Sequence, residues 1–451
     1  MAKPKTQFIC QSCGASYTKW TGRCENCDEW NTLVEQAAVS SGQSSVDKAG
    51  SSGKKITVES IQTAKNARSV PRISTGIADV DVVLGGGIVK GSVTLLAGQP
   101  GIGKSTILLQ IAAAVAQGSS VLYISGEESS HQVALRAARL GAVDTEKLDF
   151  AASTSANDIA ATVRSAQYDL VIVDSIQTVS VDEVTSAPGT VSQITNSSTV
   201  LIRAAKAAGS AMILVGHVTK EGSIAGPKVL EHLVDIVLQF EGDRYGGFKV
   251  VRAAKNRFGA TSEAAIFEMY EDGLRVVENP SATLLEERQS SDGSVVLSTL
   301  EGTRPLLVEI QALVNPTNFG YPKRTASGFD LNRLNVLIAV LERRTKLQLS
   351  DKDIYINVVG GLKLNDQAAD LAVCMAIASA AAERKIDDAT VVFGEVGLGG
   401  EIRSVVGVEK RIAEAKKLGF TRAIAPRTSS KNPFVTAVPD IRTALVDYLQ
   451  K

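Results

Sequence analysis

Short runs of β-branched and aliphatic residues alternate with segments of helical periodicity from about Ser69 to Glu278. This alternation is typical of an α/β fold in which crossover helices join the strands of a mostly parallel, doubly wound sheet. The predicted strands are Val93–Ala97, Val121–Ser125, Leu170–Asp174, Ala211–Gly216, Ile236–Glu241 and Phe248–Ala253. An amphipathic helix is predicted over Ser105–Ala116.

A second α/β region is predicted from about Ser281 to the end of the chain. Its strands are expected at Val295–Ser298, Leu306–Ala312, Ile354–Val359, Thr390–Gly394 and Arg422–Ala425. Its helices are expected at Phe329–Arg344, Gln367–Glu383 and Val408–Leu418. Cys374 falls on the second of these helices and is expected to be a buried, unreactive side chain.

Four cysteines near the N-terminus form two C-x2-C pairs, Cys10 with Cys13 and Cys24 with Cys27. Two such pairs on tight turns can hold one Zn²⁺ tetrahedrally, with each sulfur about 2.3 Å from the metal. Disulfides are the alternative, but they need an oxidising compartment, and the first residues show no apolar signal sequence. Three aromatic residues are expected to form a small core around the metal: Tyr17, Trp20 and Trp30.

Composition limits the class of protein. The chain has 451 residues, and its hydrophobic fraction of 44% is sufficient for packed cores, which excludes a disordered or fibrous protein. Lys plus Arg number 48 and Asp plus Glu also number 48, so any nucleic-acid contact must come from local basic clusters. The chain shows no apolar run of the roughly 18 residues that a membrane span needs. We therefore expect a cytoplasmic protein.

A phosphate-binding loop lies between the first predicted strand and the predicted helix. The pattern G-x4-G-K-S is formed by Gly98, Gln99, Pro100, Gly101, Ile102, Gly103, Lys104 and Ser105, and we add Thr106 to the predicted contacts. Backbone N–H groups of such a loop surround phosphate oxygens, and the helix N-terminus favours negative charge. We expect Lys104 to contact the β- and γ-phosphates of ATP and the Ser105 hydroxyl to bind Mg²⁺.

Carboxylates follow two of the other predicted strands. Asp174 ends an apolar strand and is expected to bind the Mg²⁺ water shell. Glu127 and Glu128 follow Val121–Ser125, and Glu127 is the preferred candidate for activating the attacking water. The alternative is that both acids only complement a helix dipole. His217, at the end of another strand, is expected either to sense the γ-phosphate or to be structural.

The segment from Lys255 to Gly259, with the sequence KNRFG, carries two cations one residue apart. Lys255 and Arg257 could stabilise transition-state charge, as an arginine finger does. A solvated basic turn is the alternative. A second basic, glycine-containing stretch, Lys220–Lys228, is predicted to contact DNA.

These motifs together closely resemble the bacterial RadA (Sms) family of DNA-repair ATPases. The resemblance covers essentially the whole chain, and KNRFG beside the phosphate-binding loop is its most specific mark. It implies a RecA-like motor that works as a hexameric ring and drives branch migration of recombination intermediates. It also implies a helicase-type, DNA-dependent ATPase that binds single-stranded and branched DNA and acts with a RecA-type recombinase. In this family Glu127 matches the water-activating glutamate, Lys255 and Arg257 match residues acting on a neighbouring subunit, and the four cysteines match zinc ligands.

The C-terminal region resembles the proteolytic domain of Lon, but the Ser-Lys dyad is missing. Ala368 stands where the nucleophilic serine is expected, and Glu409 stands where the lysine is expected, beside Lys410. An alanine cannot act as a nucleophile, so a scaffold and DNA-binding element is predicted in place of a peptidase. Five basic residues could contact DNA phosphates: Lys323, Arg324, Arg333, Arg343 and Arg344. The last three also fit an ordinary polar helix face.

The predicted domains are a C4 zinc-finger module (1–36), a flexible linker (37–68), a RecA-like ATPase domain (69–280) and a Lon-protease-like domain (281–451). Two other functions remain open from the sequence. The Lon-like region is compatible with an ATP-dependent protease or protein-remodelling machine. A regulatory ATPase of the circadian-clock type would share the RecA fold, but it requires neither the zinc module nor the C-terminal domain.

Overall fold

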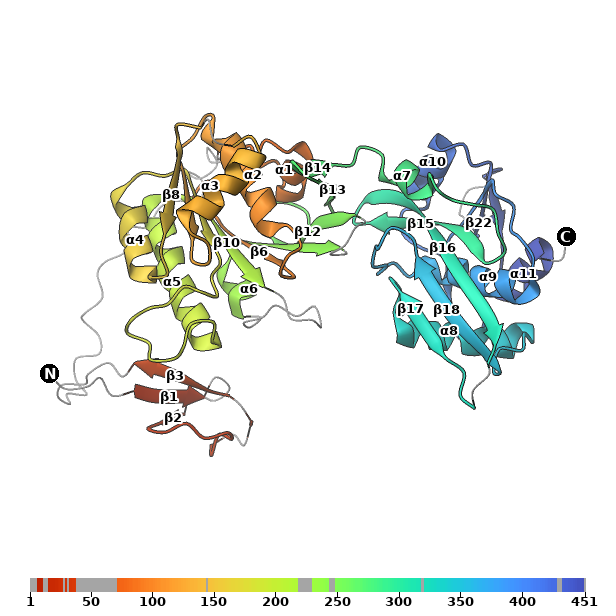
Figure 1. Cartoon of the computed structure of the whole chain (residues 1–451). Coiled ribbons are helices and arrows are strands. Elements are labelled where there is room, and N and C mark those ends of the chain that lie inside the picture. Colours follow the sequence, from red (N-terminus) through yellow and green to blue (C-terminus); the bar gives the residue numbers. More distant parts are fainter. Residues whose placement is uncertain are drawn as a thin grey trace, which may run out of the picture. The chain divides into compact units, whose positions relative to one another are not determined.

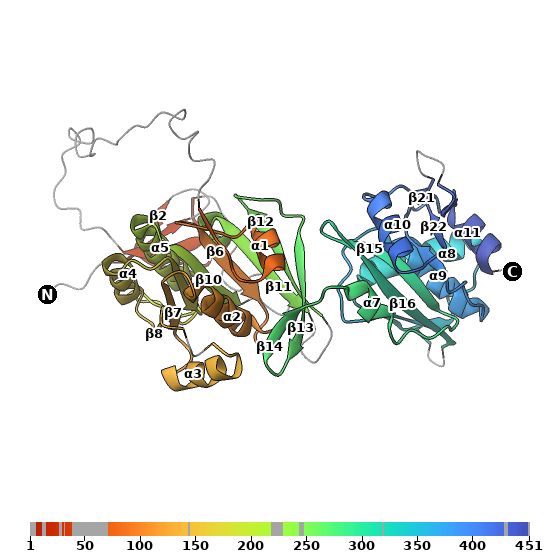
Figure 2. The same cartoon turned by 90° about the horizontal axis from the view of Figure 1, so that it is seen from above.

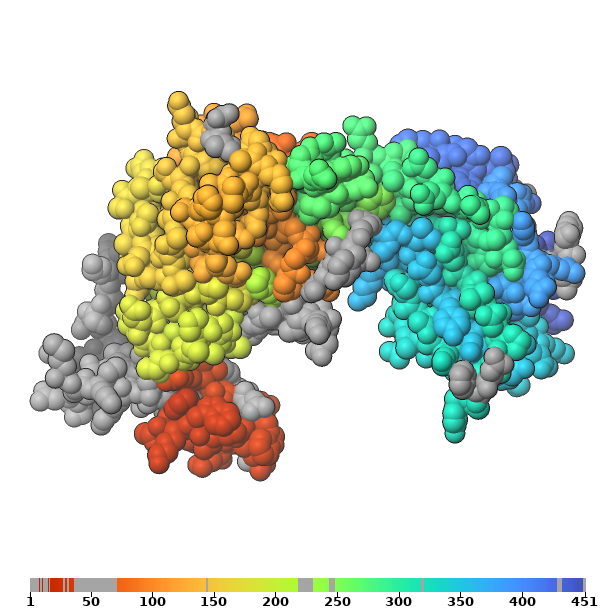
Figure 3. Space-filling view, in the orientation of Figure 1, coloured from red at the N-terminus to blue at the C-terminus, as the bar shows by residue number. Residues whose placement is uncertain are grey.

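The computed structural model describes residues 6–10, 15–26, 29–30, 32–37, 71–142, 145–217, 229–242, 248–317, 320–427 and 432–449, which are the coloured residues of Figure 3. The chain forms two compact units. The first comprises Met1–Gly76, Gly86–Gly98 and Leu108–Val237, and the second comprises Ile77–Gly85, Gln99–Ile107 and Leu238–Lys451. These units do not follow the predicted domain boundaries, which stay a prediction. The predicted linker lies almost wholly outside the described residues.

The N-terminal module is a small antiparallel sheet of order β2-β1-β3 (Figure 1). Its strands are β1 (Thr6–Cys10), β2 (Ser16–Tyr17) and β3 (Leu33–Ala37). Cys10, Cys24 and Leu33 are its buried residues, and Phe8, Ala15 and Tyr17 pack against them. So few buried apolar residues contribute little to the folding free energy of the module. Small modules of this kind usually depend on a bound metal for their stability.

The larger sheet of the first unit has the strand order β6-β10-β9-β7-β8, and all of these neighbours are parallel. The strands are β6 (Val93–Gly98), β7 (Val121–Ser125), β8 (Leu148–Ala152), β9 (Leu170–Asp174) and β10 (Ala211–His217), with a short hairpin of β4 (Arg72–Ile73) and β5 (Ile88–Val89). The predicted parallel α/β fold is confirmed. The edge strand β8 was not predicted, because its residues are half buried or exposed and lack a continuous apolar run.

Helices cover both faces of this sheet. Figure 2 shows α4 and α5 on one face and α2 and α3 on the other. The helices are α2 (Lys104–Ala116), α3 (Ser130–Arg139), α4 (Ala156–Ser165), α5 (Val191–Ala208) and the short α6 (Val229–Leu233). The amphipathic character predicted for α2 is wrong, because none of its residues is exposed. The apolar residues of α2 therefore pack on more than one side of the helix. This packing holds α2 rigidly and so supports the phosphate-binding loop that precedes it.

The second unit begins with antiparallel strands. In the order β14-β13-β12-β11 they are β14 (Gly273–Val276), β13 (Ala264–Tyr270), β12 (Lys249–Asn256) and β11 (Ile236–Gly242). Helix α1 (Ala78–Leu84) packs on β12 and β13. Strand β12 is longer than predicted: it continues past Ala253 and so includes Lys255.

The C-terminal part of the second unit is a seven-stranded mixed sheet of order β17-β18-β16-β15-β19-β22-β23 (Figure 1). Its strands are β15 (Ser294–Glu301), β16 (Arg304–Pro316), β17 (Arg324–Ser327), β18 (Lys352–Val358), β19 (Thr390–Val392), β22 (Arg422–Ala425) and β23 (Val435–Ala437), beside a hairpin of β20 (Glu395–Val396) and β21 (Ile402–Arg403). Its helices are α7 (Pro280–Leu285), α8 (Leu331–Thr345), α9 (Ala369–Ala382), α10 (Val408–Lys417) and α11 (Ile441–Leu449). All strands and helices predicted for this region are present.

Helix α9 runs through the core of this region, against β15 and β16. Cys374 on it is fully buried, and burial raises the pKa of its thiol, so the expectation of an unreactive side chain is confirmed. Throughout the described ranges of the chain, the helices are too short or too polar to cross a membrane.

Candidate nucleotide site and zinc module

Four parallel strands of the first unit end at one edge of the sheet. Their registers place Gly98 of β6 level with His217 of β10, and Ser125 of β7 level with Asp174 of β9. In open α/β sheets ligands bind outside the carboxyl ends of the strands. The predicted phosphate-binding loop starts directly after Gly98, so the register and the chain connectivity bring these residues to one edge.

The loop has the backbone that its glycines permit. Gly101 and Gly103 have φ angles of 77° and 114°, which favour glycine. A Cβ atom at Gly103 would lie 2.7 Å from Met269 Cε. Lys104 is only 5% exposed, and its Nζ donates a hydrogen bond to the Gln99 carbonyl oxygen at 2.9 Å. The loop thus holds its lysine folded inward beside the first turn of α2.

The Asp174 carboxylate is held by a residue that the sequence analysis did not select. Tyr123 of β7 donates from its hydroxyl to Asp174 Oδ2 at 2.7 Å. Burial, together with the Asp174 charge, raises the pKa of Tyr123 well above its ordinary value, so the phenol remains a donor. Asp174 supplies carboxylate oxygen and Ser105 supplies hydroxyl oxygen, which are the hard donors that Mg²⁺ prefers.

The two glutamates after β7 have different environments. Arg136 donates two hydrogen bonds to Glu128, at 2.7 and 2.6 Å, so Glu128 is taken up in a bidentate ion pair. Glu127 is exposed, and its Oε1 accepts a hydrogen bond from Ser175 Oγ at 2.5 Å. Ser175 directly follows Asp174, so Glu127 is tied to the end of β9. Ser129 caps helix α3, and neither glutamate does.

Three other residues predicted for the nucleotide site differ in their exposure to solvent. His217 is half-buried at the end of β10. Lys255 is half-buried within β12, whereas Arg257 is exposed immediately after the strand. The predicted DNA-contacting stretch 220–228 lies outside the described residues.

The zinc module places two of its four predicted ligands in its interior. Cys10 is 1% exposed and Cys24 is fully buried. Both backbone N–H groups close short turns, Cys10 to the Ala15 carbonyl at 2.8 Å and Cys24 to the Glu29 carbonyl at 2.9 Å. Buried thiols on two turns fit a tetrahedral zinc site. Cys13 and Cys27 lie outside the described residues.

The predicted aromatic core of this module is partly wrong. Tyr17 packs in it, and its hydroxyl lies 3.3 Å from Cys24 Sγ. Trp20 and Trp30 are instead 57% and 70% exposed. A module this small has room for the sulfur atoms and one ring, and the two indoles remain at its surface beside Gly22.

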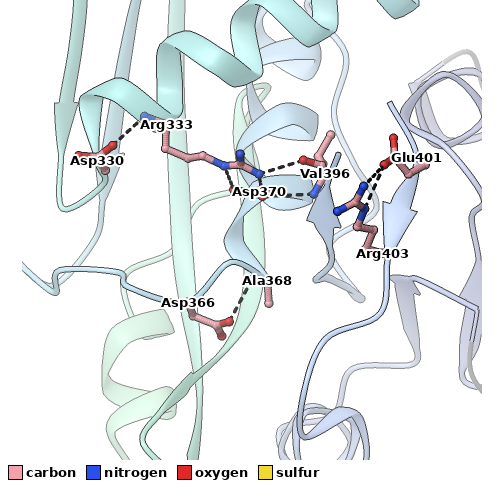
Figure 4. Close-up of polar contacts among 8 residues, drawn as sticks. All are labelled: Asp330, Arg333, Asp366, Ala368, Asp370, Val396, Glu401 and Arg403. Carbon is pink, nitrogen blue, oxygen red and sulfur yellow. Dashed lines mark hydrogen bonds and ion pairs between the residues drawn. The ribbon is translucent and has the colours of Figure 1, made fainter. Parts of the chain in front are cut away.

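In the C-terminal region, Ala368 lies beside Asp366 (Figure 4). It is fully buried, and its N–H donates to Asp366 Oδ1 at 3.0 Å. Asp366 also forms an ion pair of 2.8 Å with Arg411, whose side chain is completely buried. Glu409 is exposed, and the Lys410 ammonium donates to the Thr303 carbonyl at 3.2 Å. A dyad arrangement is therefore absent around the described Ala368.

At least three of the five basic residues considered for DNA contact form side-chain hydrogen bonds within this region. Arg333 forms hydrogen bonds to the buried Asp370 and to the Val396 carbonyl, as Figure 4 shows. Arg324 donates to the carbonyl oxygens of Lys352 and Leu349. Arg344 donates to the Leu398 carbonyl oxygen at 3.4 and 3.3 Å. DNA contact stays a prediction for all five residues.

Comparisons with known proteins cover most of the chain. Family models match it at residues 64–223 ("AAA domain"), 8–35 ("Rubredoxin metal binding domain") and 332–429 ("Subunit ChlI of Mg-chelatase"). The last match is to a chelatase subunit, so the likeness to Lon stays a prediction. A KaiC-like protein of known structure from Pyrococcus horikoshii OT3 is 21% identical, with a TM-score of 0.39, and the match covers 46% of this chain and 99% of that chain.

Full-length relatives also match. The DNA repair protein RadA of Bacillus subtilis (strain 168) is 47% identical, and the match covers 99% of both chains. The protein of the same name from Pseudomonas aeruginosa is 47% identical, and the match covers 94% of each chain. Its namesake from Brucella abortus is 46% identical over 96% of this chain and 94% of the relative. The AAA-domain match supports ATP and Mg²⁺ as cofactors, and the rubredoxin-type match supports zinc.

Proposed function

The chain belongs to the family of the DNA repair protein RadA, and from this premise we propose that it is a DNA-dependent ATPase of recombinational DNA repair. It processes recombination intermediates by branch migration, as a hexameric ring on single-stranded and branched DNA, together with a RecA-type recombinase. One observation carries the ATPase assignment. The carboxyl ends of β6, β7 and β9 share one sheet edge, where the loop after Gly98, the Glu127–Ser175 pair and Asp174 follow.

Each residue at this edge has a chemical role. The backbone N–H groups of the loop from Gly98 to Thr106, apart from Pro100, bind phosphate oxygens. Lys104 exchanges its bond to the Gln99 carbonyl for the β- and γ-phosphates. Ser105 and Asp174 hold Mg²⁺, which neutralises phosphate charge when bound. Glu127 accepts the proton of the attacking water, while the Ser175 hydroxyl keeps its carboxylate in place.

Lys255 and Arg257 act on the nucleotide of a neighbouring subunit. The exposure of Arg257, just beyond the end of β12, supports this role, because a side chain that acts in trans must project from its own subunit. A cation in this role contributes about 10³–10⁵ in rate. ATP hydrolysis therefore requires that neighbouring subunits assemble.

The C-terminal region serves as a scaffold and is not a peptidase. Ala368 offers no nucleophile and is buried, and Lys410 is bonded to a backbone carbonyl. A casein degradation assay with ATP tests this, and cleavage that is lost on substitution within residues 281–451 would contradict it.

ATP hydrolysis by the purified full-length chain, with and without single-stranded DNA, tests the main proposal. We expect DNA to raise the rate, and Lys104→Ala to abolish turnover because the phosphate-binding cation is lost. A rate that DNA does not change would contradict a DNA-dependent motor. Hydrolysis retained by Lys104→Ala would exclude this loop as the site.

Mixing variants tests the role in trans. Arg257→Ala is expected to bind ATP normally but to hydrolyse it slowly, and Lys104→Ala is expected to be inactive. In a 1:1 mixture, roughly a quarter of head-to-tail interfaces would join an intact loop to an intact Arg257, so activity should reappear. A mixture no more active than its components would contradict catalysis between subunits.

A further inference from the structure

Gln177 has a buried side-chain amide without a hydrogen bond. Neither its Nε2 nor its Oε1 has a partner within the part of the chain that the structure describes. Buried amides are normally bonded, because removing them from water carries a desolvation penalty. Gln193 of the same unit shows the usual case: its Oε1 accepts from Val181 N–H, and its Nε2 donates to the carbonyl oxygens of Val181, Val184 and Ser186. The exception at Gln177 calls for an explanation.

The turn that carries Gln177 contacts the ends of both strands beside β9. Ser175 Oγ donates to Glu127, which follows β7. The Ile176 N–H donates to the Val215 carbonyl oxygen of β10 at 3.0 Å. Gln177 comes next and lies against Gly216 of β10. Three consecutive residues therefore connect the candidate water-activating glutamate to the strand that ends in His217.

Gly216 of β10 lies next to this amide. A Cβ atom at Gly216 would lie 3.9 Å from Gln177 Nε2 and 3.1 Å from Leu95 Cδ1. The following residue, His217, is level with Gly98, where the phosphate-binding loop begins. The unbonded amide is thus held beside the edge at which the γ-phosphate is expected, with one acceptor and two donor hydrogens available.

We propose that Gln177 is a positioning residue that forms its hydrogen bonds only when a nucleoside triphosphate is bound. The proposal rests on the proposed ATPase function. The bound γ-phosphoryl group supplies a hydrogen-bond acceptor for the side-chain N–H groups of Gln177. The hydrogen bond is made directly or is relayed by the residues at the end of β10. The bonded amide then fixes the turn Ser175–Gln177, and the turn fixes Glu127 for attack by water. A nucleoside diphosphate lacks the γ-phosphoryl group and leaves the amide unbonded.

Gln177→Leu removes the amide at nearly constant volume and tests the proposal in the full-length protein. We expect the nucleotide-free unfolding midpoint to stay the same or rise, because no hydrogen bond is lost. We expect kcat to fall roughly ten- to a hundredfold, with a smaller change in KM for ATP, since buried amide bonds are worth about this factor. Stabilisation by a non-hydrolysable ATP analogue should decrease, whereas stabilisation by ADP should not.

Gln193→Leu is the matched control. It breaks four hydrogen bonds of a buried amide, so the nucleotide-free midpoint should fall, while the difference between analogue and ADP stays as in the wild type. Gln177→Asn, which keeps the amide on a shorter chain, should recover part of the lost kcat.

Two results would overturn the proposal. If Gln177→Leu lowers the nucleotide-free midpoint as Gln193→Leu does, the amide is bonded without nucleotide. If Gln177→Leu responds to the analogue and hydrolyses ATP like the wild type, the amide has no role. Failure of the ATPase assignment itself is distinguishable, because wild-type protein would then show no hydrolysis sensitive to Lys104→Ala. The comparison of analogue with ADP would still report on Gln177.

Discussion

Replacing Glu127 with glutamine is expected to stop ATP turnover while leaving the fold intact. Glu127 is exposed, and its carboxylate accepts a 2.5 Å hydrogen bond from the Ser175 hydroxyl. The glutamine amide oxygen can accept this same bond, so little stability is lost. An amide cannot take a proton from water, and a general base contributes about 10²–10⁴ in rate. We expect kcat to fall by about this factor.

Glu128→Gln is the control, and the opposite pattern is expected for it. The ion pair of Glu128 with Arg136 is bidentate, but the two side chains are 31% and 24% exposed. Solvent screens such a pair, so its loss should lower the free energy of unfolding by about 0.5–1 kcal/mol. Because the Glu128 carboxylate is ion-paired with Arg136 and does not activate water, kcat should change by no more than about twofold.

Phosphate release at saturating ATP measures kcat, a fluorescent nucleotide measures binding, and urea unfolding measures stability. Both variants should bind nucleotide, which separates a loss of chemistry from a loss of the site. If Glu127→Gln turned over normally and Glu128→Gln did not, the roles of the two carboxylates would be reversed. If both variants were fully active, the water would be activated elsewhere.

Three further predictions concern stability. Arg411→Met should lower the free energy of unfolding by about 3–5 kcal/mol in urea titrations, because it leaves the largely buried Asp366 without its cation; a loss below about 1 kcal/mol would contradict this. Burial raises the pKa of Glu301 above its ordinary value despite its ion pair with Arg252, so the folded state binds a proton more readily than the unfolded state. Wild-type protein should therefore gain stability relative to Glu301→Gln as pH falls from the folded-state pKa toward 4.5, and a pH-independent difference would refute this. Cys10→Ser should release zinc and unfold only the N-terminal module, with the urea midpoint of the remaining chain unchanged; zinc retained at wild-type stoichiometry would exclude Cys10 as a ligand.

The sequence was most informative where one physical requirement dominates a segment. Buried parallel strands need continuous apolar runs, so β6, β7, β9 and β10 were predictable almost to the residue. The residues of strand β8 are half buried or exposed and form no such run, and the strand was missed. The phosphate-binding loop was predictable because its glycines and lysine are required at fixed spacing.

Contacts between distant residues could not be obtained from these patterns. The sequence favours Glu127 as the water-activating acid, but it does not reveal that Arg136 forms an ion pair with Glu128. The hydroxyl of Tyr123 on Asp174 depends on the register of β7 with β9. Aromatic residues beside cysteines suggested a core, but the volume of the module decides which rings fit inside.

The enclosure of Ala368 has a consequence for any attempt to place a nucleophile at this position. Its side chain is shut off from water, and the backbone beside it is bound by Asp366, whose charge is compensated by Arg411. A hydroxyl introduced there by Ala368→Ser would be inaccessible to a polypeptide, and the Asp366 carboxylate beside it is already bonded to the backbone N–H of residue 368 and paired with Arg411. A single substitution to serine would therefore not create a peptidase, because the surrounding ion pair would have to be dismantled as well.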